Sequence, residues 1–216
     1  PPSQAEMQSV RGRHRDILRR FLSGHVMHGY PSTQARLWPY SFKFIPIELI
    51  SSIYEMFAHA GDSALAEALS IHYTRFGLVE LMLSLSMQGL ADTARVLDPA
   101  CGSGAFLVEA FRRLVWTRSR RLGRQLNRHE LHEILRSQIY GMDIDRDAVY
   151  VAAFSLYLAL LEMDPDPQPP DALRLPQLLG RGGGLEPNLY VQDFLNTNHE
   201  FNRTHPFSNG GFDLIV

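Results

Sequence analysis

Short apolar runs alternate with segments of helical apolar spacing over the second half of the chain. Two runs, 95–98 and 139–143, end on a carboxylate, and two more lie at 188–194 and 212–216. After the first two, apolar residues recur three and four positions apart, which is typical of a helix packed on one face. Strands that alternate with helices build an open sheet. The pattern therefore predicts an α/β fold with about four strands.

The first part of the chain shows helical spacing and no clear strand. We therefore expect two regions, a helical N-terminal region at 1–62 and a sheet-containing region at 63–216. One helix is expected to begin at Pro46, because proline is favoured in the first turn, and to end at Gly61. Its apolar face, including Tyr54, is assigned to the core, with no role beyond packing for that tyrosine.

A turn of small residues follows the first apolar run and opens a helix. Gly102 and Gly104 allow the backbone to pass close to a ligand, because glycine has no Cβ. The carboxylate of Asp98 precedes them, and Leu107 stands where a dinucleotide fingerprint has its third glycine. A negative charge here disfavours a phosphate and suits a cation. The turn therefore favours a ligand with a positive centre, such as S-adenosyl-L-methionine. A nucleotide site and a plain strand–helix turn remain as alternatives.

The ten residues from Asp98 to Leu107, D-P-A-C-G-S-G-A-F-L, resemble the cofactor loop of N6-adenine-specific DNA methyltransferases from restriction–modification systems. The resemblance implies a Rossmann-like methyltransferase sheet that depends on S-adenosyl-L-methionine, here incomplete at about four strands. It also implies cofactor contacts from six residues of the loop: Asp98, Pro99, Ala100, Cys101, Gly102 and Gly104.

Tyr73 and Thr74 resemble the Tyr-Thr-Pro element that precedes the loop in the same family, with Arg75 in place of the proline. In the family this element touches the methionine end of the cofactor. Threonine is also a good N-cap residue, so Thr74 is expected to cap the helix that follows.

Two further acidic positions resemble family elements in the expected order. Asp143 ends the second apolar run and is assigned to the ribose hydroxyls, with Ile144 against the adenine ring. Asp193 and Phe194 follow the third run and are assigned to the adenine amine and the adenine face. Asp145 is expected to cap the next helix.

The family's catalytic motif, Asn-Pro-Pro-Tyr, does not occur in this sequence and is expected directly after Val216. No catalytic residue is therefore assigned. The sequence resembles a fragment truncated after the fourth strand, which is expected to bind cofactor without transferring methyl groups. Contact with DNA is expected mainly through parts absent from this chain, including a recognition subunit or domain. N4-cytosine, RNA and protein-glutamine methylation stay open as alternatives, as does a non-catalytic assembly module.

The composition is that of an ordinary globular protein, with a formal net charge of −2 and a single cysteine. One cysteine provides no disulfide framework, which is typical of a reducing cytoplasm. The N-terminus lacks a signal-peptide pattern, and no apolar stretch is long enough to span a bilayer. We therefore expect a soluble cytoplasmic protein without a membrane partner.

The arginines between 112 and 128 are interpreted as a solvated face. His129 and His132 are too close together for a zinc motif, so no metal is expected.

Overall fold

The computed structural model describes residues 47, 49, 50, 53, 54, 74–165, 175–179, 187–195 and 211–216. All of them belong to the second of two units into which the chain divides, Pro46–Val216. The elements bounded within this part follow in the order α5 (Phe76–Ser86), β1 (Val96–Asp98), α6 (Ala105–Leu122), α7 (Arg128–Gln138), β2 (Ile139–Asp143), α8 (Arg146–Met163), β3 (Leu189–Val191) and β4 (Leu214–Ile215). The predicted α/β class is confirmed. The predicted boundary at 62 lies outside the described residues and stays a prediction.

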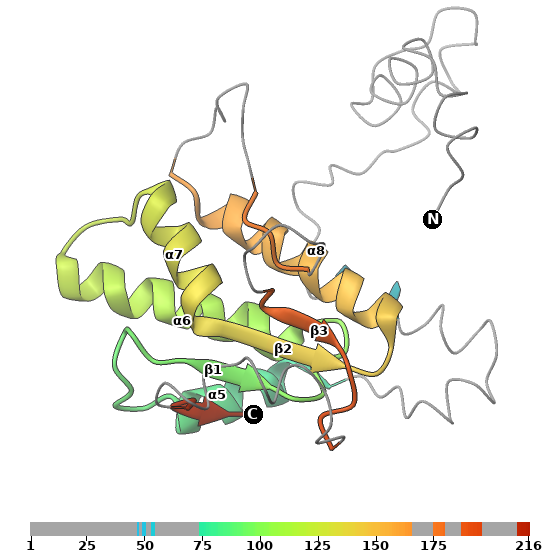
Figure 1. Ribbon diagram of the computed structural model, residues 1–216. Coiled ribbons are helices and arrows are strands. Elements are labelled where there is room, and N and C mark those ends of the chain that lie inside the picture. The colour runs from blue at the N-terminus through green and yellow to red at the C-terminus, as the bar shows by residue number, and fades with distance from the viewer. Residues whose placement is uncertain are drawn as a thin grey trace, which may run out of the picture. The chain divides into compact units, whose positions relative to one another are not determined.

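The four strands form one parallel sheet in the order β3-β2-β1-β4 (Figure 1). This is the order of the first four strands in a classic doubly wound sheet, in which ligands bind beyond the carboxyl ends of the strands. Strand β1 lies inside the sheet, with Asp98 opposite Gly141 of β2. The register on the far side of β2 places Asp143 opposite Val191.

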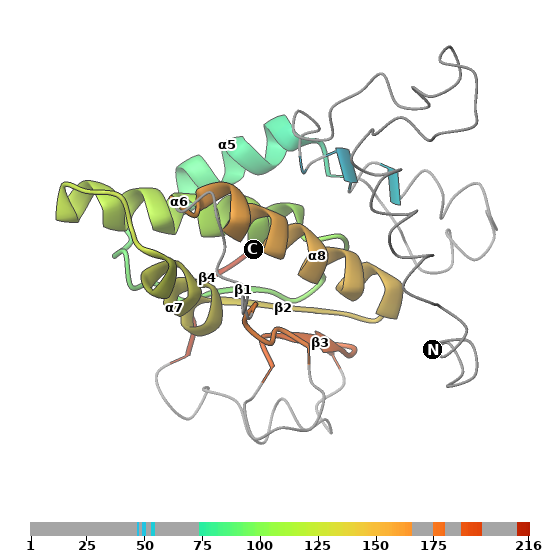
Figure 2. The same ribbon diagram turned by 90° about the horizontal axis from the view of Figure 1, so that it is seen from above.

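Helices α5, α6 and α8 lie over one face of the sheet (Figure 2). Alternate strand residues face them, because successive side chains of a strand point to opposite faces. Val96, Ile139 and Leu189 are buried in the large core on this side. The opposite face carries a smaller core of Leu97, Tyr140 and Met142, against which the rings of Tyr190, Phe194 and Phe212 pack.

Local sequence signals explain where the helices begin and end. Helix α6 begins after Gly104 and ends before Gly123, and both glycines have positive φ angles, 90° and 67°. Helix α7 begins with a capping box in which the side chains of Asn127 and Glu130 each accept from the other's backbone N–H. The side chain of Asp145 caps α8, as the sequence predicts. The arginine-rich stretch is therefore divided between two helices. None of the helices described is long and apolar enough to cross a membrane.

Two predictions about burial are wrong. The apolar run at 212–216 predicts a buried fourth strand, but Ile215 is 53% exposed. Within the described part of the chain, β4 pairs only with β1, so it is an edge strand of two residues. The helical residues near position 50 are also less buried than expected, since Ile47 is buried whereas Ile53 is 40% exposed.

Candidate functional site

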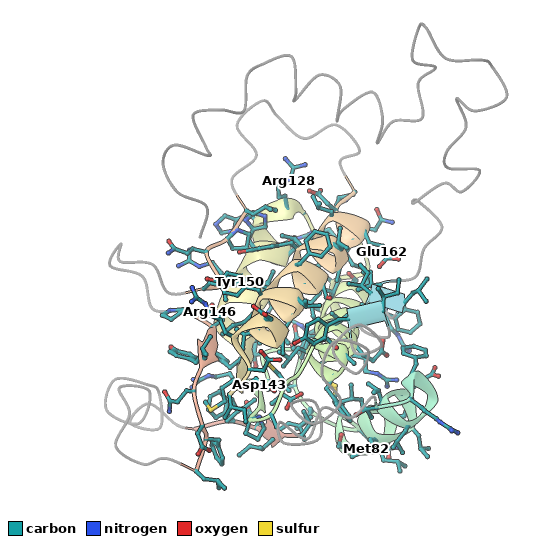
Figure 3. All side chains as sticks on the ribbon, turned by 90° about the vertical axis from the view of Figure 1, so that its right-hand side faces the viewer. Met82, Arg128, Asp143, Arg146, Tyr150 and Glu162 are labelled. Carbon is teal, nitrogen blue, oxygen red and sulfur yellow. The ribbon has the colours of Figure 1, made fainter. Side chains whose placement is uncertain are left out.

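The carboxyl ends of the parallel strands bring the predicted acidic residues to one edge of the sheet. Asp98 is the last residue of β1, Asp143 is the last residue of β2, and Asp193 lies two residues beyond β3. Figure 3 views this edge, with Asp143 labelled below the first turn of α8, where Arg146 and Tyr150 are also labelled. Three acidic residues therefore lie at the carboxyl ends of three neighbouring strands.

The turn between β1 and α6 is fixed to β2 by backbone hydrogen bonds. The N–H of Cys101 donates to the carbonyl of Met142 at 2.8 Å, and the N–H of Gly104 donates to the carbonyl of Cys101 at 2.8 Å. Gly102 has a φ angle of 50°, and no atom lies within 4 Å of the place where its Cβ would stand. Gly102 therefore faces open space, as a ligand-binding turn requires.

Gly104 is glycine for a different reason. Its φ angle is 90°, and a Cβ there would stand 3.0 Å from both Cα and Cβ of Ala152 in α8. The turn therefore rests directly on α8. A side chain at this position would push the turn away from the helix.

Asp143 joins the turn to the start of α8. Its Oδ2 accepts from the N–H of Gly102 at 2.8 Å, and its Oδ1 accepts from the N–H of Asp145 at 2.8 Å. A carboxylate has about four acceptor sites, so both oxygens keep lone pairs for a ligand. The neighbouring Ile144 is 54% exposed and offers an apolar surface beside this carboxylate.

Asp98 is a buried carboxylate with few partners. It is only 5% exposed, and its Oδ1 accepts from the N–H of Ala100 at 3.1 Å. Burial raises its pKa from the ordinary 3.8 to about 7, the bond from Ala100 opposes this rise, and the charge of Asp143 adds to it. Within the described part of the chain, no cationic side chain contacts it. A cationic ligand would remove this imbalance.

A cavity of about 220 Å³ opens beside Asp98. Its lining comes from the end of β1, the glycine turn, the first residues of α6, and one residue each from before α5 and after β4. The lining residues are Thr74, Asp98, Ala100, Cys101, Gly102, Ser103, Ala105, Phe106 and Val216. Cys101 is buried here, and burial together with the two nearby acids raises the pKa of its thiol well above the ordinary value. Pro99 is half-buried in the same turn. The cavity is smaller than the ligand sites of about 300–1,000 Å³ that are common in proteins, so it accommodates part of a larger ligand.

Thr74 reaches this cavity but does not cap α5, so that prediction is wrong. The N-cap residue is Arg75, whose side chain makes no capping hydrogen bond. Its carbonyl accepts instead from the N–H groups of Leu78 and Val79. Tyr73 lies outside the described residues.

The third acidic element lies apart from the cavity lining. Asp193 is exposed, and its Oδ1 accepts from the N–H of Leu195 at 2.9 Å. Phe194 is half-buried against the small core on the sheet face away from the helices. The structure thus brings together Thr74, Asp98 and the glycine turn at one cavity. Asp143, Ile144 and Asp193 continue along the edge beyond it.

Sequence reasoning missed several residues of this site. Phe106 and Val216 line the cavity, and Ser103 is buried beside it. Ser103 lies between two assigned glycines, which was a usable signal. Tyr54 was assigned to packing alone, whereas its hydroxyl donates to Asp145.

A larger cavity of about 600 Å³ lies between α5 and α6, away from this edge. Three of its charged lining residues form ion pairs, Arg113 with Glu109 and Arg112 with Glu162. Nothing in its lining combines a glycine turn with a carboxylate. Among the described residues, no cluster of histidine, cysteine and acidic side chains could hold a metal ion.

Comparison with known proteins finds a similar family for the central part of the chain. Residues 81–172 match the family described as "MmeI, DNA-methyltransferase domain". This stretch includes β1, the glycine turn and β2 with its terminal carboxylate. The match covers less than half of the chain and leaves the segment with β3 and β4 outside it.

Three curated relatives are similar over parts of the chain. The chain is 41% identical over 76 residues to a putative type II restriction enzyme and methyltransferase, RM.MjaORFECS2P of Methanocaldococcus jannaschii, covering 33% of the chain and 6% of that protein. It is 30% identical over 111 residues to the type II restriction enzyme and methyltransferase RM.BcgI of Heyndrickxia coagulans, covering 51% of the chain and 16% of that protein. It is 37% identical over 73 residues to the adenine-specific methyltransferase PglX of Streptomyces coelicolor, covering 32% of the chain and 6% of that protein.

The chain thus spans between 6% and 16% of the length of these relatives. Among solved structures, a DrdV–DNA complex determined by cryo-electron microscopy is similar, with 21% sequence identity and a TM-score of 0.43. The match covers 71% of this chain and 14% of the chain in that complex.

Proposed function

We propose that this chain is the cofactor-binding part of a DNA methyltransferase of a restriction–modification or phage-defence system. The cofactor would be S-adenosyl-L-methionine, and the target would be N6 of adenine in DNA. One observation carries the proposal. Asp98 and Asp143 end adjacent parallel strands, the N–H of Gly102 joins the turn to Asp143, and Asp98 is buried without a described cationic partner.

The residues present fit this cofactor, which supplies a methyl group activated on a sulfonium. Asp98 and the cavity beside it suit the positively charged methionine end, and Thr74 belongs to the same lining. Asp143 has free lone pairs for the ribose hydroxyls, and the exposed Ile144 offers a surface for the adenine ring. Asp193 would accept from the adenine amine. The roles of Phe194 at the adenine face and of Tyr73 at the methionine end rest on the family resemblance.

The adenine target rests on two observations. The loop from Asp98 to Leu107 resembles that of adenine-specific enzymes, and one relative is named as an adenine-specific methyltransferase. The motif expected to hold the target base does not occur in this sequence. DNA recognition is therefore proposed for the full-length protein, together with its recognition domain or subunit.

Calorimetry of S-adenosyl-L-methionine binding tests the proposal. Asp143→Ala should weaken binding at least tenfold, because charge-assisted hydrogen bonds contribute about 1.5–3 kcal/mol each. Asp143→Asn, which keeps the shape and one acceptor oxygen, should also weaken binding. Asp147→Ala is the matched control, because it removes an exposed carboxylate nearby that accepts none of the described hydrogen bonds from the turn.

The outcomes separate the parts of the proposal. Wild-type chain that does not bind the cofactor would overturn it as a whole. Unchanged affinity in both Asp143 variants would remove Asp143 from the ribose role alone. In a tritium-transfer assay on duplex DNA, the 216-residue chain should show no turnover. Clear turnover would mean that residues present here build a complete active site.

A further inference from the structure

A hydrogen bond links the N-terminal helical residues to the cofactor edge. The hydroxyl of Tyr54 donates to Oδ2 of Asp145, a residue 91 positions later in the chain. Both residues are half-buried. Packing alone would not need the hydroxyl, since phenylalanine fills nearly the same volume.

Asp145 transmits this contact to the proposed ribose site. Its Oδ1 accepts from the N–H of Asp147 at 2.9 Å and so caps α8, while its own N–H donates to Asp143 at 2.8 Å. Asp143 accepts in turn from Gly102. One continuous series of hydrogen bonds therefore runs from Tyr54 through Asp145 and Asp143 to the glycine turn.

The charges at this point explain why a donor is needed. Asp143, Asp145 and Asp147 lie within five residues of each other, and their negative charges repel. Among the described residues, Tyr54 is the only one whose side chain donates to any of the three carboxylates. Burial, the bond to Asp145 and the nearby acids all raise the pKa of Tyr54 above its ordinary value. The hydroxyl therefore stays protonated and remains a donor at neutral pH.

We propose that Tyr54 is a positioning residue for the cofactor ribose, because it holds Asp145 and thereby fixes the carboxylate of Asp143 against the turn. This inference rests on the proposed function. It assigns to the N-terminal helical residues a direct part in building the cofactor site, which extends the site to a residue 91 positions before Asp145.

Tyr54→Phe tests the proposal, because it removes the hydroxyl and keeps the ring. Tyr157→Phe is the matched control. Tyr157 lies in α8, the helix that Asp145 caps. Its hydroxyl donates to the carbonyl of Pro176 at 2.8 Å and makes no described contact with the three acids. Both variants lose one half-buried hydroxyl, so a general loss of stability affects them alike.

The probes are S-adenosylhomocysteine and its 2′,3′-dideoxy derivative, which lacks both ribose hydroxyls. Tyr54→Phe should weaken the binding of S-adenosylhomocysteine about threefold to tenfold. The lost bond is charge-assisted, but it reaches Asp143 only through Asp145. Binding of the dideoxy derivative should change less than twofold. Tyr157→Phe should leave both affinities within twofold of wild type. Unchanged affinity in Tyr54→Phe, or equal weakening of both ligands, would overturn the positioning role.

Amide hydrogen exchange separates this inference from the proposed function. Tyr54→Phe should accelerate exchange at the N–H groups of Gly102 and Asp145 relative to Tyr157→Phe. Wild-type protein that binds neither ligand would refute the proposed function. In that case, faster exchange would still establish the link from Tyr54 to the turn, and unchanged exchange would refute the link as well.

Discussion

Two buried carboxylates lie at opposite ends of the central strand and are treated differently by the protein. Asp92, at the amino end of β1, accepts from the guanidinium groups of Arg118 and Arg121. Its backbone carbonyl accepts from Arg118 and from the side chain of Gln138. Asp98, at the carboxyl end, is as deeply buried but accepts only from a backbone N–H within the described residues.

The difference separates an acid whose charge is paired within the chain from one whose charge is not. A buried charge is costly unless it is paired and hydrogen-bonded. Two arginines compensate the charge of Asp92, and a glutamine satisfies its backbone carbonyl, so the amino end of the sheet is complete without a ligand. The charge of Asp98 is not compensated by any described side chain, which is why we propose a cationic ligand at the carboxyl end.

The largest effect is expected at the amino end. Asp92→Ala should lower the free energy of unfolding by about 3–5 kcal/mol, because Arg118 then remains buried with only its longer ion pair to Glu133, at 3.8 Å. Chemical denaturation measures the change. Asp98→Asn is the contrasting variant and should leave the free energy of unfolding at pH 8 unchanged or slightly higher, since it removes an uncompensated buried charge. A similar loss in both variants would contradict the distinction.

A smaller effect is expected from pH at the carboxyl end. Folding raises the pKa of Asp98 from 3.8 to about 7, so its contribution to stability is full below pH 3.8 and is lost as the pH rises through 7. A cationic ligand needs the ionised form, so its affinity should change in the opposite direction. Between pH 6 and pH 8, affinity for S-adenosyl-L-methionine should rise about tenfold in calorimetry.

Asp98→Asn provides the control for this pH dependence. It should bind the cofactor more weakly and should not show the tenfold rise between pH 6 and pH 8. A wild-type affinity that is equal at both pH values would mean that Asp98 does not face the cation.

The smallest effect is expected at the start of α5. Arg75 has a φ angle of −56°, within the range of proline, and stands where the resembling family has proline. Arg75→Pro should stabilise the protein by about 0.4–1 kcal/mol, because it restricts the unfolded chain. Cofactor affinity should stay within twofold of wild type. A larger loss of affinity would show that the guanidinium itself takes part in binding.

The fold and the local parts of the site could be predicted from the sequence. Apolar periodicity identified β1, α6, β2 and α8, and the cap at Asp145 follows from local preferences. The cap predicted at Thr74 is wrong because the backbone of α5 begins one residue later, after Arg75, and side-chain type alone does not fix that position. Tyr54 could not be found, since its partner lies 91 residues away and no local pattern records such a contact.

The arginine-rich stretch shows the same limit. Its basic residues were interpreted as a solvated face, but six of them pair with acids, partly from distant elements: Arg112 with Glu162, Arg113 with Glu109, Arg118 and Arg121 with Asp92, Arg124 with Glu130 and Arg128 with Asp164. A run of positive charge in the sequence is therefore largely neutralised in the folded chain. It gives no support to a basic surface for DNA at this place.

The pairing of β1 with β4 has a consequence for the order of folding. The N–H of Arg95, just before β1, donates to the side chain of Asp213, 118 residues later. Contacts so distant form slowly, because a long loop must close before they contribute. During synthesis, β1, α6, β2 and α8 can therefore assemble while β4 is still being made. Val216, which lines the cavity beside Asp98, is made after the other residues of that lining, so a nascent chain would carry its glycine turn before it has a closed pocket.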